Sequence, residues 1–219
     1  EPAAKASISP LPELSPLYWL SGVDLRANGA QRTVVAIGDS ITDGQNSTVD
    51  GLATYPNRLT QRVLANADLA GVTVINSGIG GNRLLSDGGM YGERLVARFQ
   101  RDALDVPGVS HVIVLIGVND IQFGKLLPDQ AKTFDDMVAG YTQLVQAAHA
   151  QGVKILWGTI LPFGGQADDS PELESQRQAL NTWLRANTAK ADAVIDFDQV
   201  LRDPAQITRL LPRYDSGDH

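Results

Sequence analysis

Residues 33–44 read TVVAIGDSITDG, an apolar run that passes directly into a polar turn with a glycine at either end. The run Thr33–Ile37 is apolar at nearly every position and rich in Val, which is typical of a strand buried on both faces of a parallel sheet. Ser40 follows within the turn. Because open parallel sheets bind ligands beyond the carboxyl ends of their strands, this stretch predicts both the fold class and the position of a functional site.

Four further short apolar runs repeat this pattern along the chain, and amphipathic stretches with helical spacing separate them. Strands that alternate with helices predict right-handed βαβ crossovers. The sequence therefore predicts an α/β fold, in which a doubly wound parallel sheet of five strands forms the middle of three α/β/α layers. The further predicted strands are Val72–Asn76, His111–Ile116, Val153–Thr159 and Ala193–Phe197, and the predicted helices are Tyr55–Ala67, Thr133–Gln151 and Pro171–Lys190.

The composition is that of a globular domain. Of the 219 residues, 43% are hydrophobic and 20% are charged, which allows a core and excludes a disordered or fibrous chain. The net charge of −7 argues against nucleic acid or an anionic membrane as the main partner. No run approaches the roughly 18 apolar residues that a membrane span requires. The absence of cysteine excludes disulfides, thiolate metal ligands and a cysteine nucleophile.

The chain divides into an arm and a domain. Residues 1–30 contain four prolines and little periodicity, so residues 1–32 are predicted to form an N-terminal arm outside the core. Residues 33–219 are predicted to form the domain. The chain begins at Glu1 without a methionine, which fits a processed secreted or periplasmic protein and fits a piece of a longer chain as well.

Small and hydrogen-bonding residues follow three of the predicted strands, all at one edge of the sheet. Ser40 comes after the first strand, Gly81 after the second and Asn119 after the third. A serine becomes a nucleophile when a base removes its proton, and the oxyanion that its attack creates needs fixed hydrogen-bond donors. Backbone N–H groups can approach such an oxyanion closely at glycine. Each motif alone is more often a turn or a helix cap, but together they predict Ser40 as a nucleophile with donors from Ser40, Gly81 and Asn119.

These motifs resemble the first three sequence blocks of the SGNH (GDSL-type) hydrolases. The matching residues are Gly38-Asp39-Ser40, Gly81 and Gly117-x-Asn119-Asp120. The resemblance implies a flavodoxin-like fold and an enzyme that hydrolyses esters through a serine, without a metal or an organic cofactor. It assigns Ser40 as the nucleophile, and the Gly81 backbone N–H and the Asn119 side-chain amide as oxyanion donors. Gly80 is the alternative to Gly81 if the loop is shifted by one residue.

Three further segments are similar to those of a subgroup of xylan-esterase-like arylesterases and acylhydrolases. They are Leu20–Arg26, Gly80–Leu85 and Tyr214–His219. This likeness implies a short-chain ester as the substrate, above all an acetyl ester of a polysaccharide, although short aryl or lipid esters fit the residues equally well. In the subgroup a β-rich region often precedes the first segment, so residues 1–32 would form the join to a missing upstream region.

The C-terminus departs from the family pattern. The family completes its catalytic triad with Asp-x-x-His, and Asp218 takes the place of the aspartate, so the matching histidine would fall two residues beyond His219. The resemblance therefore implies that the sequence stops short of that histidine and of the family's final helix. In the alternative, His219 is the base and Asp215 or Asp218 orients it. The other histidines do not replace it, because His111 opens a strand at the opposite edge of the sheet and His149 lies on a helix.

Several other residues allow two interpretations. Arg83 either contacts a polar acyl or sugar group of the substrate or is a surface arginine. Phe163 either lines the substrate cleft or anchors its loop. Asp39 is predicted to form a turn or a cap rather than to bind a metal. Asp196 and Asp198 are predicted to cap a loop, because no apolar pocket is evident that would raise the pKa of one carboxyl, as glycosidase chemistry requires.

Two other functions compete with that of an esterase. A flavodoxin-like module could bind phosphate or a flavin through the hydroxyl groups of residues 40–48, but the loops of Gly81 and Asn119 would then have no role. A catalytically dead relative that binds carbohydrate is favoured if the chain ends at His219. The main hypothesis is a serine esterase that acts on a small ester or an acetylated carbohydrate.

Overall fold

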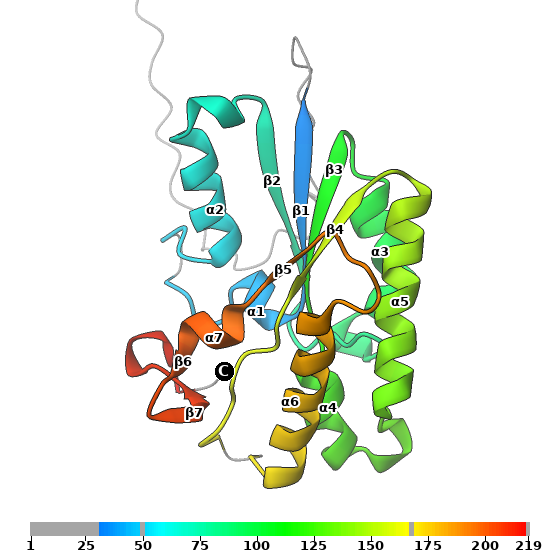
Figure 1. Cartoon of the computed structure of the whole chain (residues 1–219), viewed down its shortest axis with the longest axis vertical. Coiled ribbons are helices and arrows are strands. Elements are labelled where there is room, and N and C mark those ends of the chain that lie inside the picture. The colour runs from blue at the N-terminus through cyan, green and yellow to red at the C-terminus, as the bar shows by residue number, and fades with distance from the viewer. Residues whose placement is uncertain (1–30, 49–50, 167–168, 218–219) are drawn as a thin grey trace, which may run out of the picture.

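A computed structural model describes residues 31–48, 51–166 and 169–217, which contain a five-stranded parallel sheet with helices on both faces (Figure 1). The strands are β1 (Arg32–Gly38), β2 (Val72–Gly78), β3 (Val109–Leu115), β4 (Lys154–Gly158) and β5 (Ala193–Ile195). They pair in the order β2-β1-β3-β4-β5. This is the flavodoxin-like order, whose switch point lies between β1 and β3. The predicted fold class is confirmed.

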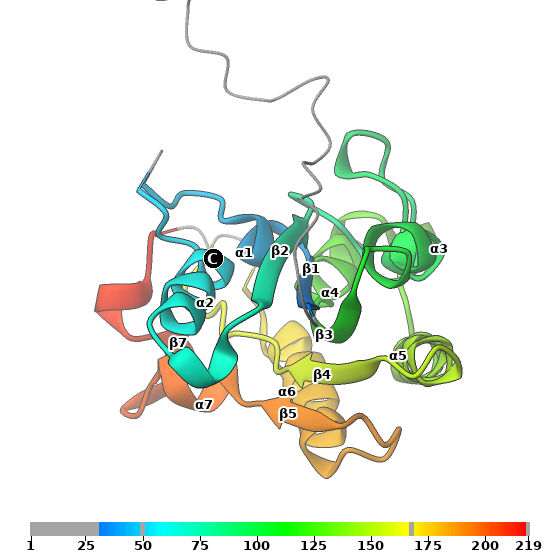
Figure 2. The same cartoon turned by 90° about the horizontal axis from the view of Figure 1, so that it is seen from above.

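The helices form the two outer layers of the predicted three (Figures 1 and 2). On one face of the sheet, α2 (Tyr55–Leu64) packs against β2, and on the other face lie α3 (Leu95–Phe99), α5 (Phe134–Ala150) and α6 (Pro171–Ala186). Shorter helices begin just after the ends of β1, β3 and β5: α1 (Ser40–Asp43), α4 (Val118–Leu126) and α7 (Phe197–Leu201). Short 3-10 turns lie at Ala67–Leu69, Gly89–Tyr91, Pro128–Gln130 and Pro212–Tyr214, and a π-helical turn at Gln100–Leu104.

Capping residues explain where the long helices begin and end. Thr133 and Asp136 form a reciprocal capping box at the start of α5. The prediction placed the end of α6 at Lys190, but the helix ends at Ala186. The reason is that Asn187 adopts a left-handed conformation with a φ of 51°, which terminates the helix.

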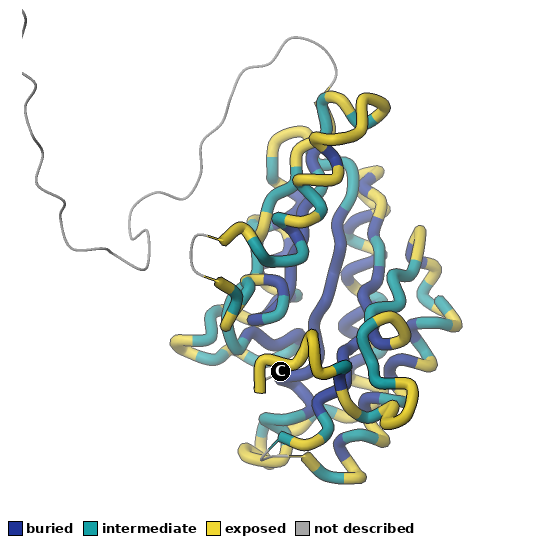
Figure 3. The backbone as a smooth tube through the Cα atoms, turned by 90° about the vertical axis from the view of Figure 1, so that its left-hand side faces the viewer, coloured by how far each residue is buried: buried dark blue, intermediate teal, exposed yellow. Residues whose placement is uncertain are grey.

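The core packs the sheet against α5 and α6. Trp157 of β4 is fully buried, and its ring meets that of Tyr141 of α5 edge-on, with 5.3 Å between the ring centroids. Trp183 of α6 contacts the same tyrosine, with centroids 5.8 Å apart. Figure 3 shows that the central strands are buried along most of their length, whereas residues 212–217 are exposed. The loops at the carboxyl ends of the strands therefore start from a close-packed base.

A small hairpin follows α7 and was not predicted. Its strands, β6 (Arg202–Asp203) and β7 (Gln206–Leu210), pair antiparallel. Leu210 is the one buried residue of β7, so the segment lacks the alternation that identifies a strand in a sequence. The backbone N–H of Gly164, in the loop after β4, donates to the carbonyl of Thr208 across an N–O distance of 2.7 Å. This bond holds the hairpin against the edge of the sheet where the predicted site lies.

Some predictions fall outside the described residues. These are the first 30 residues of the N-terminal arm, and Asp218 and His219 at the other end. Within the described ranges, no helix has both the length and the apolarity needed to cross a membrane.

Candidate functional site

Hydrogen bonds join the three loops that follow β1, β2 and β3. The N–H of Ile79, after β2, donates to the carbonyl of Gly38, the last residue of β1, over 3.1 Å. The side-chain amide of Asn119, at the start of α4, donates to the carbonyl of Asn82 over 3.0 Å. The loops predicted to carry the nucleophile and the oxyanion donors therefore form one connected edge of the sheet.

Ser40 is the first residue of α1, and only 2% of its surface is exposed. Asp39 caps this helix, since its Oδ1 accepts a hydrogen bond from the N–H of Ile41 over 3.0 Å, and the predicted cap role of Asp39 is confirmed. Gly38 has no room for a side chain, because a Cβ there would lie 2.0 Å from the carbonyl oxygen of Leu115. The glycine thus lets β1 and β3 approach each other directly before the serine, which fixes the start of α1 against the sheet.

The loop after β2 turns at Gly81. Its φ of 72° is left-handed, and a Cβ there would lie 2.2 Å from Cδ1 of the Tyr91 ring. At Gly80 the nearest atom to such a Cβ is 3.7 Å away, so the loop requires glycine at position 81 rather than at position 80. Asn82 holds the turn in place, because its buried Nδ2 donates to the carbonyls of Tyr91 and Glu93 over 2.9 Å each. This role of Asn82 was not predicted, because its two partners lie 9 and 11 residues further along the chain.

Two consecutive residues of α4 hold this same loop. The amide of Asn119 carries two hydrogens, and its bond to Asn82 uses one of them. The buried carboxyl of Asp120 accepts the N–H of Leu84 over 2.8 Å and that of Leu85 over 3.2 Å. These partners are 36 and 35 residues away in the sequence, so no local pattern could have indicated the role of Asp120.

Two buried carboxyl groups lie behind the loops. Burial and, to a smaller extent, the nearby charge of Asp120 raise the pKa of Asp39 to about 7, against the hydrogen bond from Ile41, which lowers it. Burial also raises the pKa of Asp120 to about 6, against the hydrogen bonds from Leu84 and Leu85. Both groups therefore change their charge near neutral pH.

Replacing Asp39 by asparagine is expected to remove part of the pH dependence of stability. The pKa of Asp39 rises from 3.8 to about 7 on burial, so the folded state binds this proton more tightly than the unfolded chain does. For this group, the free energy of unfolding falls as the pH rises from about 4 to 7 and is level above that, a change on the order of 4 kcal/mol. The side-chain oxygen of asparagine can still accept the N–H of Ile41, but asparagine does not titrate and so adds no pH dependence to the free energy of unfolding.

Urea unfolding of both proteins across that pH range provides the measurement. The stability of Asp39→Asn relative to the wild type should increase with pH. Asp136→Asn is a control of opposite sign, because hydrogen bonds from Thr133 lower the pKa of Asp136. The stabilising effect of Asp136 is present above about pH 4 and is lost below it, so the measurements on this control extend to more acidic pH. A variant at Asp39 whose stability follows the same pH slope as the wild type would contradict this assignment.

The two histidines in the described ranges lie away from Ser40. His111 is near the amino end of β3, where it pairs with Lys154 at the start of β4. His149 is near the end of α5, and its Nε2 lies 3.0 Å from a carboxylate oxygen of Asp192. Both are at the opposite edge of the sheet, as predicted for His111, and neither is placed to take a proton from Ser40.

The C-terminal segment begins beside α1. Leu210, the last residue of β7, packs with Leu115 at the end of β3 and with Leu161 in the loop after β4. Ile41, directly after Ser40, is packed against the same cluster. The C-terminal segment, residues 211–219, therefore begins next to the loop of Ser40. In the sequence this segment contains Asp218 and His219.

Arg83 and Phe163, the two predicted substrate contacts, are both buried. Arg83 is 4% exposed, so the interpretation as a surface arginine is wrong. Its guanidinium donates to Oε1 of Gln130 over 2.7 Å and to the carbonyl of Asp87 over 2.6 Å, and it lies over the ring of Phe123. Phe163 is 2% exposed and belongs to the main core cluster, which favours its role as a loop anchor. The contacts of both side chains are therefore with other residues of the protein.

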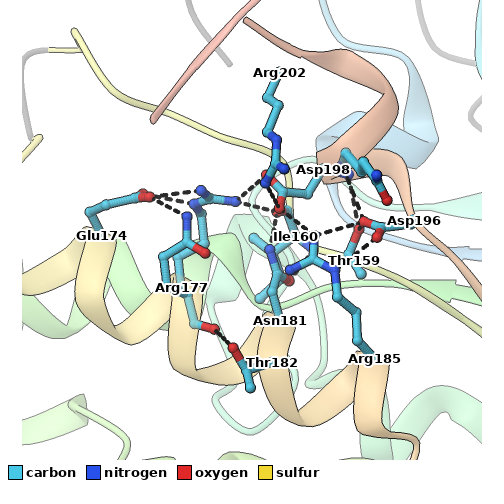
Figure 4. A network of polar contacts seen from close by, with 12 residues as sticks. Thr159, Ile160, Glu174, Arg177, Asn181, Thr182, Arg185, Asp196, Asp198 and Arg202 are labelled. Carbon is cyan, nitrogen blue, oxygen red and sulfur yellow. Dashed lines mark hydrogen bonds and ion pairs between the residues drawn. The ribbon is translucent and has the colours of Figure 1, made fainter. Parts of the chain in front are cut away.

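Asp196 and Asp198 have different roles. Asp196 caps α7, as predicted, by accepting the N–H of Gln199 over 3.1 Å. Asp198 is fully buried and binds Arg177 over 2.8 Å, so its predicted role as a cap is wrong. Figure 4 shows the ion-pair network around it, which also includes Arg185, Arg202 and Glu174. Sequence spacing does not reveal this network, because it joins α6 to α7 and β6.

Two hydroxyl groups considered for phosphate binding are used within the protein. The hydroxyl of Thr42 is buried and lies 3.2 Å from that of Tyr55. The hydroxyl of Ser47 donates to the carbonyl of Gly44.

Comparisons with known proteins agree with the fold. A model of the GDSL-like lipase/acylhydrolase family matches residues 36–217. A lipolytic G-D-S-L family protein from Desulfitobacterium hafniense DCB-2 is 21% identical with a TM-score of 0.61, over 82% of this chain and 84% of that one. A variant of an acetyl xylan esterase from Geobacillus stearothermophilus is 21% identical with a TM-score of 0.57, over 77% of each chain. An SGNH-hydrolase family esterase is 17% identical with a TM-score of 0.62, over 88% of this chain and 87% of that one.

These identities are low, so the likeness to the solved structures shows the fold alone. No sequence among the curated proteins matches the chain. Two further structures of the Geobacillus esterase are catalytic mutants, in which a histidine, or an aspartate three positions before it, is replaced by alanine.

Proposed function

Since the chain belongs to the GDSL-like lipase/acylhydrolase family of SGNH hydrolases, we propose that it is a serine esterase that cleaves carboxylic esters with acetyl or other short acyl groups. The observation that carries this proposal is the connected edge formed by the loops of Ser40, Gly81 and Asn119. The proposed nucleophile stands at the start of a helix, and hydrogen bonds made by Asn82 and Asn119 hold the loop proposed to carry the further donors.

In the proposed mechanism, the Ser40 oxygen attacks the carbonyl carbon of the ester while a base removes its proton. The N–H groups of Ser40 and Gly81 and the side-chain amide of Asn119 bind the oxyanion that forms. The intermediate then breaks its bond to the alkoxide oxygen, which receives that proton from the base and leaves as the alcohol, while the acyl group stays on Ser40. A water molecule, activated by the same base, releases the acid and restores the serine.

We assign the base to a histidine of the C-terminal segment, with Asp218 as the group that orients it. Two facts support this assignment. Leu210 brings the start of that segment beside Ile41 and therefore beside Ser40. In the Geobacillus esterase one short segment supplies both the replaced aspartate and the replaced histidine, three positions apart, and with Asp218 as the aspartate that spacing places the histidine two residues beyond His219. His219 is the histidine that this segment contains.

Acetylated polysaccharide is the proposed natural substrate. Its support is the acetyl xylan esterase among the similar folds. The test compares p-nitrophenyl acetate, butyrate and octanoate, and measures acetate released from acetylated xylan. Activity is expected to fall as the acyl chain lengthens, and a preference for the octanoate would contradict a short-chain specificity.

Labelling with a fluorophosphonate tests the nucleophile directly. The reagent forms a covalent bond to an activated serine, and mass spectrometry of the digested protein then locates the modified residue. We expect the label on Ser40, because it is the serine next to the proposed donor loops. A label on another serine, or none on protein that hydrolyses the acetate ester, would overturn the assignment.

A further inference from the structure

The buried side chain of Arg98 joins separate segments of the proposed site by hydrogen bonds. This residue of α3 is 1% exposed, and all of its bonding groups point into the protein. Its Nη2 donates to the carbonyl of Gly38 over 2.9 Å, and its Nη1 donates to that of Ser77 over 2.9 Å. Its Nε donates to Oδ1 of Asn82 over 3.0 Å, and Nη1 also lies 3.2 Å from a carboxylate oxygen of Asp102. One guanidinium thus contacts the ends of β1 and β2 and the loop that follows β2.

The acceptors of Arg98 lie directly beside the proposed catalytic groups. Gly38 precedes Ser40 by two residues, and Asn82 immediately follows Gly81. The carbonyl of the same Asn82 accepts the amide of Asn119. A chain of hydrogen bonds therefore runs from Arg98 through Asn82 to the third proposed donor.

The chemistry of the guanidinium makes this arrangement specific. It is planar, it is always charged, and its five N–H groups have a fixed fork geometry, so acceptors that bind it are fixed relative to one another. Burying such a charge is unfavourable, and its ion-pair partner Asp102 is itself partly exposed. A neutral apolar residue would fill the same core position without this penalty.

We propose that Arg98 is a positioning residue of the esterase, which sets the distance between Ser40 and the donors of Gly81 and Asn119. This inference rests on the proposed function. It assigns to Arg98 no contact with the substrate. Its effect passes through Gly38 and Asn82, whose positions determine where the nucleophile and the oxyanion donors lie.

Arg98→Lys provides the test, because an ammonium keeps the charge but cannot span three acceptors in one plane. A misplacement of about 1 Å in an active site can reduce turnover by about 100-fold. We expect kcat for p-nitrophenyl acetate to fall by about 10- to 100-fold, with KM changed by less than about threefold, at a temperature where circular dichroism shows a folded protein. A kcat within about twofold of the wild type would overturn the proposal.

A double-mutant cycle with Asn119→Ala separates positioning from general stability. If Arg98 acts through the oxyanion donors, the two losses in kcat overlap, and the double variant is less impaired than their product predicts. The matched control is Arg177→Lys. Arg177 is also fully buried and bound to two carboxylates and a carbonyl, but in the separate network of Figure 4. Its effect on kcat, if any, should multiply with that of Asn119→Ala, and independent effects for Arg98 as well would overturn the proposal.

Two further measurements distinguish a folding defect and a wrong functional assignment from a wrong role for Arg98. If Arg98→Lys does not unfold cooperatively, Arg98→Gln, which leaves no ammonium in the interior, is subjected to the same cycle. Wild-type protein that neither hydrolyses the acetate ester nor reacts with the fluorophosphonate would refute the proposed function itself. Active wild type with an unaffected kcat in a folded Arg98 variant would refute only the positioning role.

Discussion

Ser40→Ala is expected to reduce kcat for p-nitrophenyl acetate by about 10⁴- to 10⁶-fold, because alanine has no oxygen to attack the carbonyl carbon. The residual rate would come from the donors and from substrate binding alone. The fold should persist. The cap of α1 is made by Asp39 rather than by Ser40, and alanine suits a helix start that is already buried.

Steady-state hydrolysis, with far-UV circular dichroism on the same samples, measures both expectations. Ser47→Ala is the matched control, since Ser47 lies in the same loop and its hydroxyl donates to the carbonyl of Gly44. This control should keep near wild-type activity. Substantial activity in folded Ser40→Ala would remove the acyl-enzyme mechanism.

Asn119→Ala is expected to lower kcat by about 10²- to 10³-fold with little change in KM, since an oxyanion donor acts mainly on the transition state. The same substitution removes the bond to the Asn82 carbonyl, so the free energy of unfolding should also fall by about 1–2 kcal/mol. Kinetics and urea unfolding therefore report two separate effects of one amide.

Gln122→Ala provides the comparison on the same helix. Gln122 lies one turn further along α4 and donates to Gln166 over 3.3 Å. Its loss should leave kcat near that of the wild type. A rise in KM with unchanged kcat in Asn119→Ala would instead indicate that the amide binds the ground state of the substrate.

The strands and long helices were predictable because their signals are local. Strands buried on both faces read as continuous Val- and Ile-rich runs, and Thr133 marks the start of α5 through its own side chain. The hairpin of β6 and β7 escaped prediction because β7 buries only Leu210, and its other contacts, such as the bond from Gly164 and the ion pair of Arg202 with Asp198, are made with other elements.

For the site, the sequence indicated the candidate residues within the motifs. It did not indicate the residues that fix the positions of those motifs by hydrogen bonds. Arg98 acts on Gly38, 60 residues earlier in the chain, and Asp120 acts on Leu84, 36 residues earlier. The sequence predicts an exposed side chain for Arg83, because arginine is seldom buried unless it is paired, and its side-chain partner Gln130 lies 47 residues away. Such contacts follow from the strand order, which places three separate loops side by side.

Because the segment proposed to supply the base follows the hairpin of β6 and β7, we expect this hairpin to set a lower thermal limit for activity than the sheet does. Its longer strand has five residues and buries one side chain, and units of this size open with a free energy well below that of the whole domain. Asp218 and His219 follow the hairpin in the sequence. When the hairpin opens, the segment proposed to supply the base is released while Ser40 and its donor loops stay folded. Heat inactivation would then begin as a local and reversible event, from which cooling alone restores the enzyme.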